Sequence, residues 1–210
     1  VIAVAVAAAS ALIPAWEQSH MSFGPFHMGR KLPKDVATSA ESLQKLAKAS
    51  KVLYHKEGLA TTVTVKQTPT GDRILLVNGK PDASSSGDLH TQSLLAHVPH
   101  LLHPGPRHTL VIGLGSGITL GSSGLHPVER LDCAEISPAV VEASRYFDAY
   151  NYRILDDPRV HMLVADGRNH LALTARTYDV ITSEPSNPWI AGIADLFTQE
   201  FFRLCHDRLN

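Results

Sequence analysis

Three glycines at alternate positions follow a run of branched apolar residues in Thr109-Leu-Val-Ile-Gly-Leu-Gly-Ser-Gly117. This order predicts a buried strand that ends in a tight turn, with a helix beginning just after it. Backbone N–H groups of the turn would face a bound ligand, because glycine lets a ligand approach the main chain closely. The residues predicted to bind that ligand are Gly113, Gly115, Ser116 and Gly117.

The glycine spacing indicates which class of ligand to expect. A dinucleotide-binding turn has glycine at positions 1, 3 and 6 of its motif, but position 6 is here Ile118. A Gly-x-Gly-x-Gly turn after a first strand is more typical of nucleosides that carry a sulfonium, such as S-adenosylmethionine. The alternative is a turn that serves only to let a helix pack closely on a strand.

Acidic residues end two of the strands predicted further along the chain. Glu135 ends the strand at 131–136, about 20 residues after the glycine turn, and a carboxylate there can accept both hydroxyl hydrogens of a ribose. Asp166 and Gly167 end the strand at 160–164, where oxygen atoms can accept from an adenine amino group. The alternatives are a solvent-facing strand end for the first site and a common turn pair for the second.

A stiff loop with two prolines follows the last predicted strand, in Ser183-Glu-Pro-Ser-Asn-Pro-Trp189. Glu184 lies at the strand tip, where a carboxylate can hold a cationic amine and accept its proton during attack on carbon next to sulfur. Asn187 can accept from the same amine, and Trp189, after Pro188, can cover the site or stack on a flat acceptor. The alternative is a rigid connection in which Glu184 is only a helix-end charge.

These residues need a scaffold of alternating strands and helices, which the second half of the chain predicts. The alternation argues for a parallel, doubly wound sheet, in which ligands lie at the carboxyl ends of the strands where the strand order reverses. The predicted strands are 110–112, 131–136, 160–164 and 180–183, and the predicted helices are 138–146 and 198–209. Because the sequence ends at Asn210 after a helix, the sheet is expected to be incomplete.

The chain divides into three predicted parts. Residues 88–210 are the α/β domain, and residues 51–87 are a small antiparallel β-meander of three strands with a hairpin turn at Asn78-Gly79. Residues 1–50 are an apolar segment, a linker and a short helix. The apolar segment, Val1 to Ile13, is shorter than the about 20 residues that span a bilayer. We interpret it as a truncated membrane helix, with a signal-peptide core or a buried or disordered helix as alternatives.

A helix predicted at 88–102 begins the α/β domain. Its inward-facing residues are expected to be Leu94, Leu95, Val98 and Leu101. Pro99 is expected to kink or end this helix. Three histidines recur along it without a carboxylate or cysteine to complete a metal-binding pattern, so we expect no metal site. The histidines expected at the surface or at the helix end are His97, His100 and His103.

The charge balance excludes one class of partner. The 210 residues include 19 basic and 20 acidic side chains, for a formal net charge of −1, so the chain has no basic footprint for nucleic acid. The two cysteines indicate a reducing compartment rather than a disulfide framework. A small molecule is therefore the expected partner.

Short motifs stand in one order between about Val52 and Leu209. They are Leu95-Ala-His-Val-Pro99, Leu102-His-Pro-Gly-Pro106, Gly113-Leu-Gly-Ser-Gly117, Cys133-Ala-Glu-Ile136, Asp156-Asp-Pro-Arg159, Asp166-Gly167, Tyr178-Asp-Val-Ile181 and Leu196-Phe-Thr-Gln-Glu-Phe201. With these motifs the chain resembles the spermidine synthase (polyamine aminopropyltransferase) family. The resemblance implies a small antiparallel β-domain before an S-adenosylmethionine-methyltransferase-like (Rossmann-like) sheet. It also implies a homodimer that transfers an aminopropyl group from decarboxylated S-adenosylmethionine to a polyamine, without a metal.

The resemblance also implies roles for single residues near the cofactor. Gln92 falls where the family places a glutamine or histidine near the cofactor. Glu135, followed by Ile136, falls on the ribose-binding acid. Asp166, followed by Gly167, falls on an adenine-side acid.

Four positions depart from the family pattern. Ser116 stands where the family carries an aspartate that pairs with the aminopropyl amine, and Glu184 stands where it has the proton-accepting aspartate. Asn187 replaces a second acceptor-binding aspartate, and Thr91 replaces a tyrosine of the acceptor pocket. Fewer anionic partners weaken the binding of an ammonium group, and a neutral residue in the turn also admits ordinary S-adenosylmethionine.

Three functions follow from these patterns. The leading hypothesis is aminopropyl transfer to a polyamine, with Glu184 as base and orienter. The first alternative is an S-adenosylmethionine-dependent N-methyltransferase, because Asn187-Pro-Trp189 is similar to an amine-orienting loop of such enzymes. The second is a non-catalytic nucleoside-binding module of a membrane protein. The resemblance to a branch fused behind membrane helices implies membrane association with a cytoplasmic catalytic domain; otherwise a cytoplasmic protein is expected.

Overall fold

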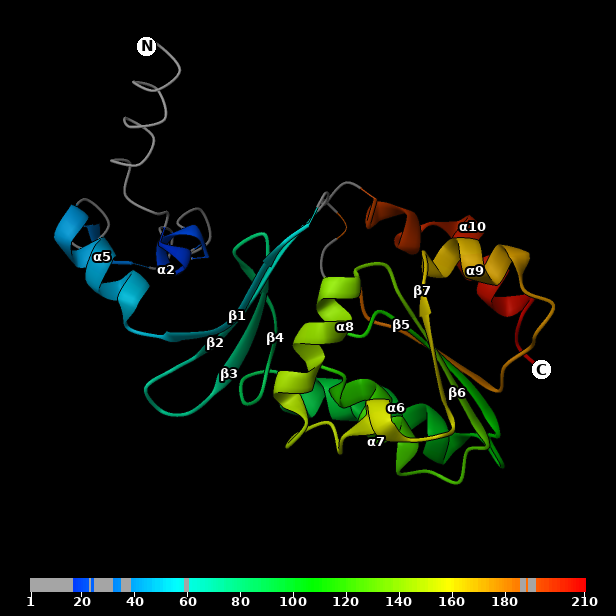
Figure 1. Cartoon of the computed structure of the whole chain (residues 1–210). Coiled ribbons are helices and arrows are strands. Elements are labelled where there is room, and N and C mark those ends of the chain that lie inside the picture. Colours follow the sequence, from blue (N-terminus) through cyan, green and yellow to red (C-terminus); the bar gives the residue numbers. More distant parts are fainter. Residues whose placement is uncertain are drawn as a thin grey trace, which may run out of the picture.

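The computed structural model of this protein describes residues 17–22, 24, 32–34, 39–58, 61–185, 188 and 192–210. Figure 1 shows an antiparallel sheet beside the N-terminal helices and a parallel sheet that carries the later helices. The N-terminal helices are α2 (Gln18–Met21) and α5 (Ala40–Lys48). The predicted membrane-helix remnant, Val1 to Ile13, lies outside the described residues. Within the described ranges, no helix is long and apolar enough to cross a membrane.

The antiparallel sheet contains four strands. They are β1 (Lys51–Glu57), β2 (Thr62–Gln67), β3 (Arg73–Val77) and β4 (Lys80–Ser84), paired in that order. Asn78 and Gly79 have φ of 52° and 75°, as a tight hairpin turn between β3 and β4 requires. The prediction of three strands is therefore wrong, because β1 is a fourth. Its polar and apolar residues do not alternate and are mostly half-buried, which hides an edge strand from a period-two pattern.

The parallel sheet confirms the predicted fold class. Its strands are β5 (His108–Ile112), β6 (Arg130–Glu135), β7 (Val160–Val164) and β8 (Val180–Ser183), arranged in the order β7-β6-β5-β8. The order reverses at β5, which pairs with β6 on one side and β8 on the other. At its carboxyl end Ile112 is opposite Ala134 of β6 and Ser183 of β8. Ligands bind at such reversal points in doubly wound sheets.

Helices cover both faces of the parallel sheet (Figure 1). They are α6 (Leu89–Leu102), α7 (Ile118–Gly124), α8 (Pro138–Ser144), α9 (Gly167–Leu173) and α10 (Gln199–His206), with short 3-10 helices η1 (Arg145–Phe147), η2 (Ile154–Asp156) and η3 (Ala194–Phe197). Successive side chains of a strand point to opposite faces. Val111 of β5 accordingly packs in a core with residues of α7 and α8, whereas Leu110 packs in a second core with Leu171 of α9 and Phe201 of α10.

The larger core joins the two sheets. Val63, Val65 and Leu75 of the antiparallel sheet belong to the same buried cluster as Val111 of the parallel sheet. Helix α8 contacts both β2 and β6, and its Glu142 accepts hydrogen bonds from Tyr54 Oη at 2.8 Å and Lys56 Nζ at 2.6 Å. These contacts hold the antiparallel sheet close to the glycine turn.

The buried face of α6 is not the one that the sequence predicts. Its buried residues are Gln92, Ala96 and His100. The predicted inward-facing residues Leu94, Val98 and Leu101 are exposed, Leu101 by 75%. The polar residues are buried because hydrogen-bond partners for them lie in the interior. His100 forms hydrogen bonds with the Ala96 carbonyl and the Thr109 hydroxyl, and Gln92 accepts one from Ser116 of the glycine turn. Pro99 does not end α6, which continues to Leu102, and a kink at Pro99 stays a prediction.

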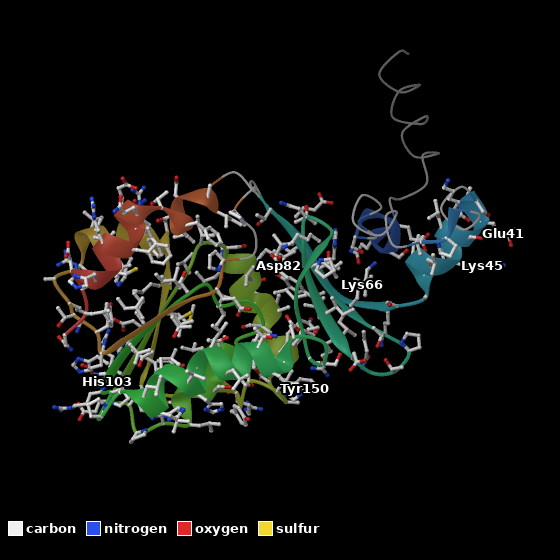
Figure 2. The ribbon with its side chains drawn as sticks, turned by 180° about the vertical axis from the view of Figure 1, so that it is seen from behind. Glu41, Lys45, Lys66, Asp82, His103 and Tyr150 are labelled. Atoms are coloured by element: carbon white, nitrogen blue, oxygen red, sulfur yellow. The ribbon has the colours of Figure 1, made fainter. Side chains whose placement is uncertain are left out.

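Three histidines gather at the end of α6 and the loop after α7. His100 lies in the last turn of α6, one of the two positions expected for it, but it is buried and not at the surface, with only 4% of the residue exposed. It stacks on His126 with ring centroids 4.7 Å apart, and His126 Nε2 lies 2.9 Å from His97 Nδ1. His103 lies at the outer end of α6, as expected (Figure 2). Among the described residues, no group of three or more His, Cys, Asp or Glu side chains could hold a metal ion.

This histidine cluster should make stability depend on pH. Desolvation is the first cause that lowers the pKa of both His100 and His126, so below about pH 6.5 the unfolded chain binds more protons than the folded one. The free energy of unfolding should therefore fall as pH drops below about 6.5, by up to about 1.4 kcal/mol per pH unit for each histidine. Urea denaturation of wild type and His100→Gln across this range measures the effect. An equally steep fall in the variant would contradict it.

Candidate active site

The glycine turn joins β5 to α7 in a backbone conformation that favours glycine. Gly113 and Gly117 have φ of 88° and 80°, in the left-handed region. A Cβ on Gly117 would also lie 2.9 Å from Asn151 Nδ2. That amide is buried and donates to the Ser116 carbonyl at 2.9 Å and the Ser144 carbonyl at 3.1 Å. Asn151 therefore fixes the turn, a role that nothing in the local sequence pattern indicated.

Glu135 lies beside the glycine turn, where the sequence placed it. The side chain is 7% exposed. Its Oε2 accepts from Leu114 N at 2.9 Å and its Oε1 accepts from Ser137 N at 2.8 Å. Desolvation, the largest cause, raises the pKa of Glu135, and the backbone N–H groups around it oppose that rise. Each carboxylate oxygen keeps a second acceptor site, so the group can still accept from the two hydroxyls of a ribose.

Gln92 and Ser116, which the sequence places near the cofactor, also lie together. Their side chains are hydrogen-bonded to each other. Ser116 is 0% exposed, and its hydroxyl donates to Gln92 Oε1 at 2.5 Å and accepts from Ile118 N at 3.3 Å. Gln92 Nε2 donates to the Ser84 carbonyl at 3.3 Å. These bonds tie β4, α6 and the glycine turn together. Direct contact of either side chain with a cofactor remains a prediction.

Asp166 and Gly167 follow β7 at the same edge of the sheet as Glu135. Asp166 Oδ1 accepts from Asn169 N at 2.8 Å and caps α9. Gly167 is buried against β5, where a Cβ would collide with Ile112 Cγ2, so only glycine fits there. The Glu135 carbonyl accepts from Ala165 N at 3.0 Å, which links the ends of the two strands. Asp166 thus has a structural role that is separate from the adenine contact predicted for it.

The cap and the adenine contact can be separated by substitution. Asp166→Ala should lower the free energy of unfolding by about 1 kcal/mol, because the first turn of α9 loses an acceptor. Asp166→Asn keeps a capping oxygen and should be nearly neutral. Urea denaturation of the three proteins without ligand measures the cap alone. Equal stability of wild type and Asp166→Ala would contradict a capping role.

Glu184 follows β8 and lies at the opposite side of the strand-order reversal from Glu135. Glu184 is exposed, yet its pKa is raised, first by desolvation and second by the negative charge of Asp88. An open groove of about 520 Å³ runs between α6 and β8, with Thr91 and Val98 on one wall and Ser183 on the other. Pro188 is exposed. The predicted acceptor residues Asn187 and Trp189 lie outside the described residues.

Asp88 is a candidate site residue that the sequence pattern does not indicate. The sequence predicts it only as the start of a helix, because Glu184, the carboxylate that it acts on, is remote in sequence. The structure identifies Asp88 as a site residue because its negative charge raises the pKa of Glu184. The site therefore contains carboxylates from three elements, at Asp88, Glu135 and Glu184.

Comparison with known proteins supplies the family. The family model described as "Spermine/spermidine synthase domain" matches residues 89–210, more than half of the chain. The chain belongs to the spermine/spermidine synthase family. This family assignment covers α6, the glycine turn and every strand of the parallel sheet.

The polyamine aminopropyltransferase of Thermotoga maritima is one relative of this chain. It is 29% identical over 163 residues, which cover 77% of this chain and 55% of that protein. The polyamine aminopropyltransferase of Archaeoglobus fulgidus is 32% identical over 162 residues, 77% of this chain and 59% of the relative. The chain thus spans little more than half the length of these relatives.

Solved structures of spermidine synthases resemble this member of the family. One, in complex with the transition state analogue AdoDATO, has a TM-score of 0.70 and 29% identity and covers 76% of this chain and 55% of its own. The spermidine synthase from Thermotoga maritima has a TM-score of 0.68 and 30% identity, over 76% of this chain and 54% of its own. The shared fold includes the antiparallel sheet and the Rossmann-like parallel sheet.

Proposed function

We propose that this chain binds decarboxylated S-adenosylmethionine and transfers its aminopropyl group to an amine of a polyamine. The observation that carries the proposal is the meeting of the glycine turn, Glu135 and Glu184 at the carboxyl ends of β5, β6 and β8. The family and the relatives that are polyamine aminopropyltransferases support it. The solved complex of a spermidine synthase with AdoDATO supports the donor class.

The nucleoside part of the donor would lie over the glycine turn. Glu135 accepts the ribose hydroxyls there while its bonds to Leu114 N and Ser137 N keep it in place. Ile136 is 68% exposed next to it, so an apolar surface is available to a purine ring. Asp166 and Gly167, at the end of β7, would lie toward the adenine amino group. The turn itself lets the donor approach the main chain closely.

The chemistry is an in-line displacement at the carbon next to the sulfonium. The acceptor nitrogen forms a bond to that carbon, the carbon–sulfur bond breaks, and its electron pair neutralises sulfur to leave methylthioadenosine. Glu184 accepts the proton that the amine loses. Its raised pKa makes its carboxylate a better proton acceptor than an ordinary glutamate. Fixing the amine and the donor in one geometry supplies much of the remaining rate.

The donor is proposed to be the decarboxylated form because the reactive end of the site is acidic. Ser116 contributes no charge, and its hydroxyl is bonded to Gln92. Glu184 is anionic when it acts as a base, so it attracts the ammonium of an aminopropyl group and repels a donor carboxylate. Ordinary S-adenosylmethionine carries that carboxylate.

We also propose the homodimer that the family resemblance implies, and analytical ultracentrifugation tests it. The membrane tether and the matching cellular location remain predictions that depend on Val1 to Ile13. The coding sequence that flanks this chain tests them.

The function is tested by titrating the purified protein calorimetrically with each donor and then adding putrescine. We expect the decarboxylated donor to bind more tightly, and methylthioadenosine to form only when putrescine is present. S-adenosylhomocysteine formed from the ordinary donor would instead support an N-methyltransferase. Binding without any product would support a non-catalytic module.

A further inference from the structure

Asp88 lies at the same end of the α6–β8 groove as Glu184. Helix α6 ends at Leu102 and leads to β5, which begins at the amino-end edge of the sheet. The helix therefore starts at the carboxyl-end edge, and Asp88 directly precedes it as the N-cap residue. Glu184 directly follows Ser183, the last residue of β8. Thr91 in the first turn of α6 and Ser183 line the groove together.

The hydrogen bonds of Asp88 also place it next to the cofactor turn. Its Oδ1 accepts from Ser84 N at 2.8 Å and from the Ser84 hydroxyl. Ser84 follows Ala83, whose Cβ is 3.9 Å from the position that a Cβ on Gly115 would take. Both bonds to Asp88 use the same oxygen, and no hydrogen bond from the described residues reaches Oδ2. This oxygen remains available to a ligand.

The two carboxylates interact without a cation between them. After desolvation, the negative charge of Asp88 is the remaining cause of the raised pKa of Glu184. Within the described part of the chain, no basic side chain forms an ion pair with either group. Like charges held together in a partly desolvated site favour the binding of a cation and oppose a third negative charge.

A buried hydroxyl in the same groove also lacks a partner. Thr182 of β8 is 5% exposed and lines the groove. In the described ranges its Oγ1 has no hydrogen-bond partner. A buried polar atom without a partner is costly, so the groove wall beside Glu184 is suited to a polar ligand group.

We propose that Asp88 is a specificity-determining residue for the donor, which together with Glu184 attracts the ammonium end of an aminopropyl group and repels a donor that carries a carboxylate. The inference rests on the proposed function. It assigns the choice between the two donors to a pair of side chains on α6 and β8. Neutral Ser116 in the glycine turn does not make that choice.

The test compares Asp88→Asn with wild type by calorimetric titration of decarboxylated and ordinary S-adenosylmethionine. Asparagine keeps the Oδ1 acceptor for Ser84 N and the Ser84 hydroxyl, and the Asp88 side chain makes no cap hydrogen bond to α6 that the substitution could remove, so the fold is retained. The matched control is Asp207→Asn, which removes the same charge at the C-cap of α10, next to Arg208, whose backbone carbonyl accepts from Tyr178 N. In both variants, NMR titration of the Glu184 carboxyl gives a second readout that does not depend on turnover.

We expect Asp88→Asn to reduce the preference for the decarboxylated donor by about tenfold or more, and to lower the pKa of Glu184. Asp207→Asn should leave both at the wild-type value. A wild type that prefers the decarboxylated donor, with an unchanged preference in Asp88→Asn, would overturn the role of Asp88 alone. A wild type that binds neither donor would overturn the proposed function and this role with it.

Discussion

Replacing Glu184 with glutamine should lower kcat for aminopropyl transfer by about 10²–10⁴-fold, the usual contribution of a positioned general base. Glutamine keeps the size of the side chain and a carbonyl oxygen, but it cannot accept the proton of the attacking amine. Affinity for the decarboxylated donor should fall by less than kcat does, because Glu135 and the glycine turn hold the nucleoside on the other side of the strand-order reversal. The preference over ordinary S-adenosylmethionine should also shrink, because Glu184 shares in the choice of donor. Steady-state kinetics with putrescine and calorimetry with the donor measure the two effects.

The pH profile distinguishes a base from a residue that only shapes the site. Desolvation and the charge of Asp88 raise the pKa of Glu184, and the group must be ionised to accept a proton. Wild-type kcat should therefore fall as pH drops through a pKa above the ordinary value of about 4.3. This limb should be absent from Glu184→Gln. Glu200→Gln, on the first turn of α10, is the control. A wild-type kcat in Glu184→Gln would show that Glu184 takes no part in the mechanism.

Glu135→Gln should weaken binding of the donor by about 10–100-fold, since hydrogen bonds to a charged group are worth about 1.5–3 kcal/mol. The carboxylate accepts from Leu114 N and Ser137 N and has acceptor sites left for a ribose. A glutamine amide has one acceptor oxygen, so its NH₂ group would face one of these backbone donors. The loss should appear in the calorimetric dissociation constant and much less in kcat at saturating donor.

The same substitution should also lower the free energy of unfolding by about 1–3 kcal/mol, because one buried N–H loses its acceptor. Urea denaturation without donor separates this loss from the binding effect. If Glu135→Gln is less stable but binds the donor as wild type does, Glu135 only supports the turn. The ribose contact would then be wrong.

The parts of the site that were predictable from sequence depend on strand ends. Glu135, Asp166 and Glu184 each follow a short apolar run, and in a parallel sheet the carboxyl ends of neighbouring strands meet at one edge. The positions of these residues therefore follow from periodicity and order along the chain. The glycine turn was predictable for the same reason, since its backbone conformation limits which residues can occupy it.

The features that were missed depend on contacts between distant segments. The sequence predicts an apolar inward face for α6, but Gln92 and His100 are buried because hydrogen-bond partners for them lie on the glycine turn and β5. Leu94 and Val98 of α6 then remain exposed along the groove beside β8. Asp88 was missed likewise, because its importance depends on a carboxylate on another element. Such pairings have no local signature in sequence.

The most direct test of the central claim is the mass of the product formed from putrescine. Purified protein is incubated with putrescine and decarboxylated S-adenosylmethionine, and the acceptor is analysed by mass spectrometry, with Glu184→Gln in parallel. We expect a product larger than putrescine by one aminopropyl group, formed by wild type and nearly absent with the variant. A methylated acceptor formed from ordinary S-adenosylmethionine, or an acceptor left unchanged by a protein that binds the donor, would contradict it.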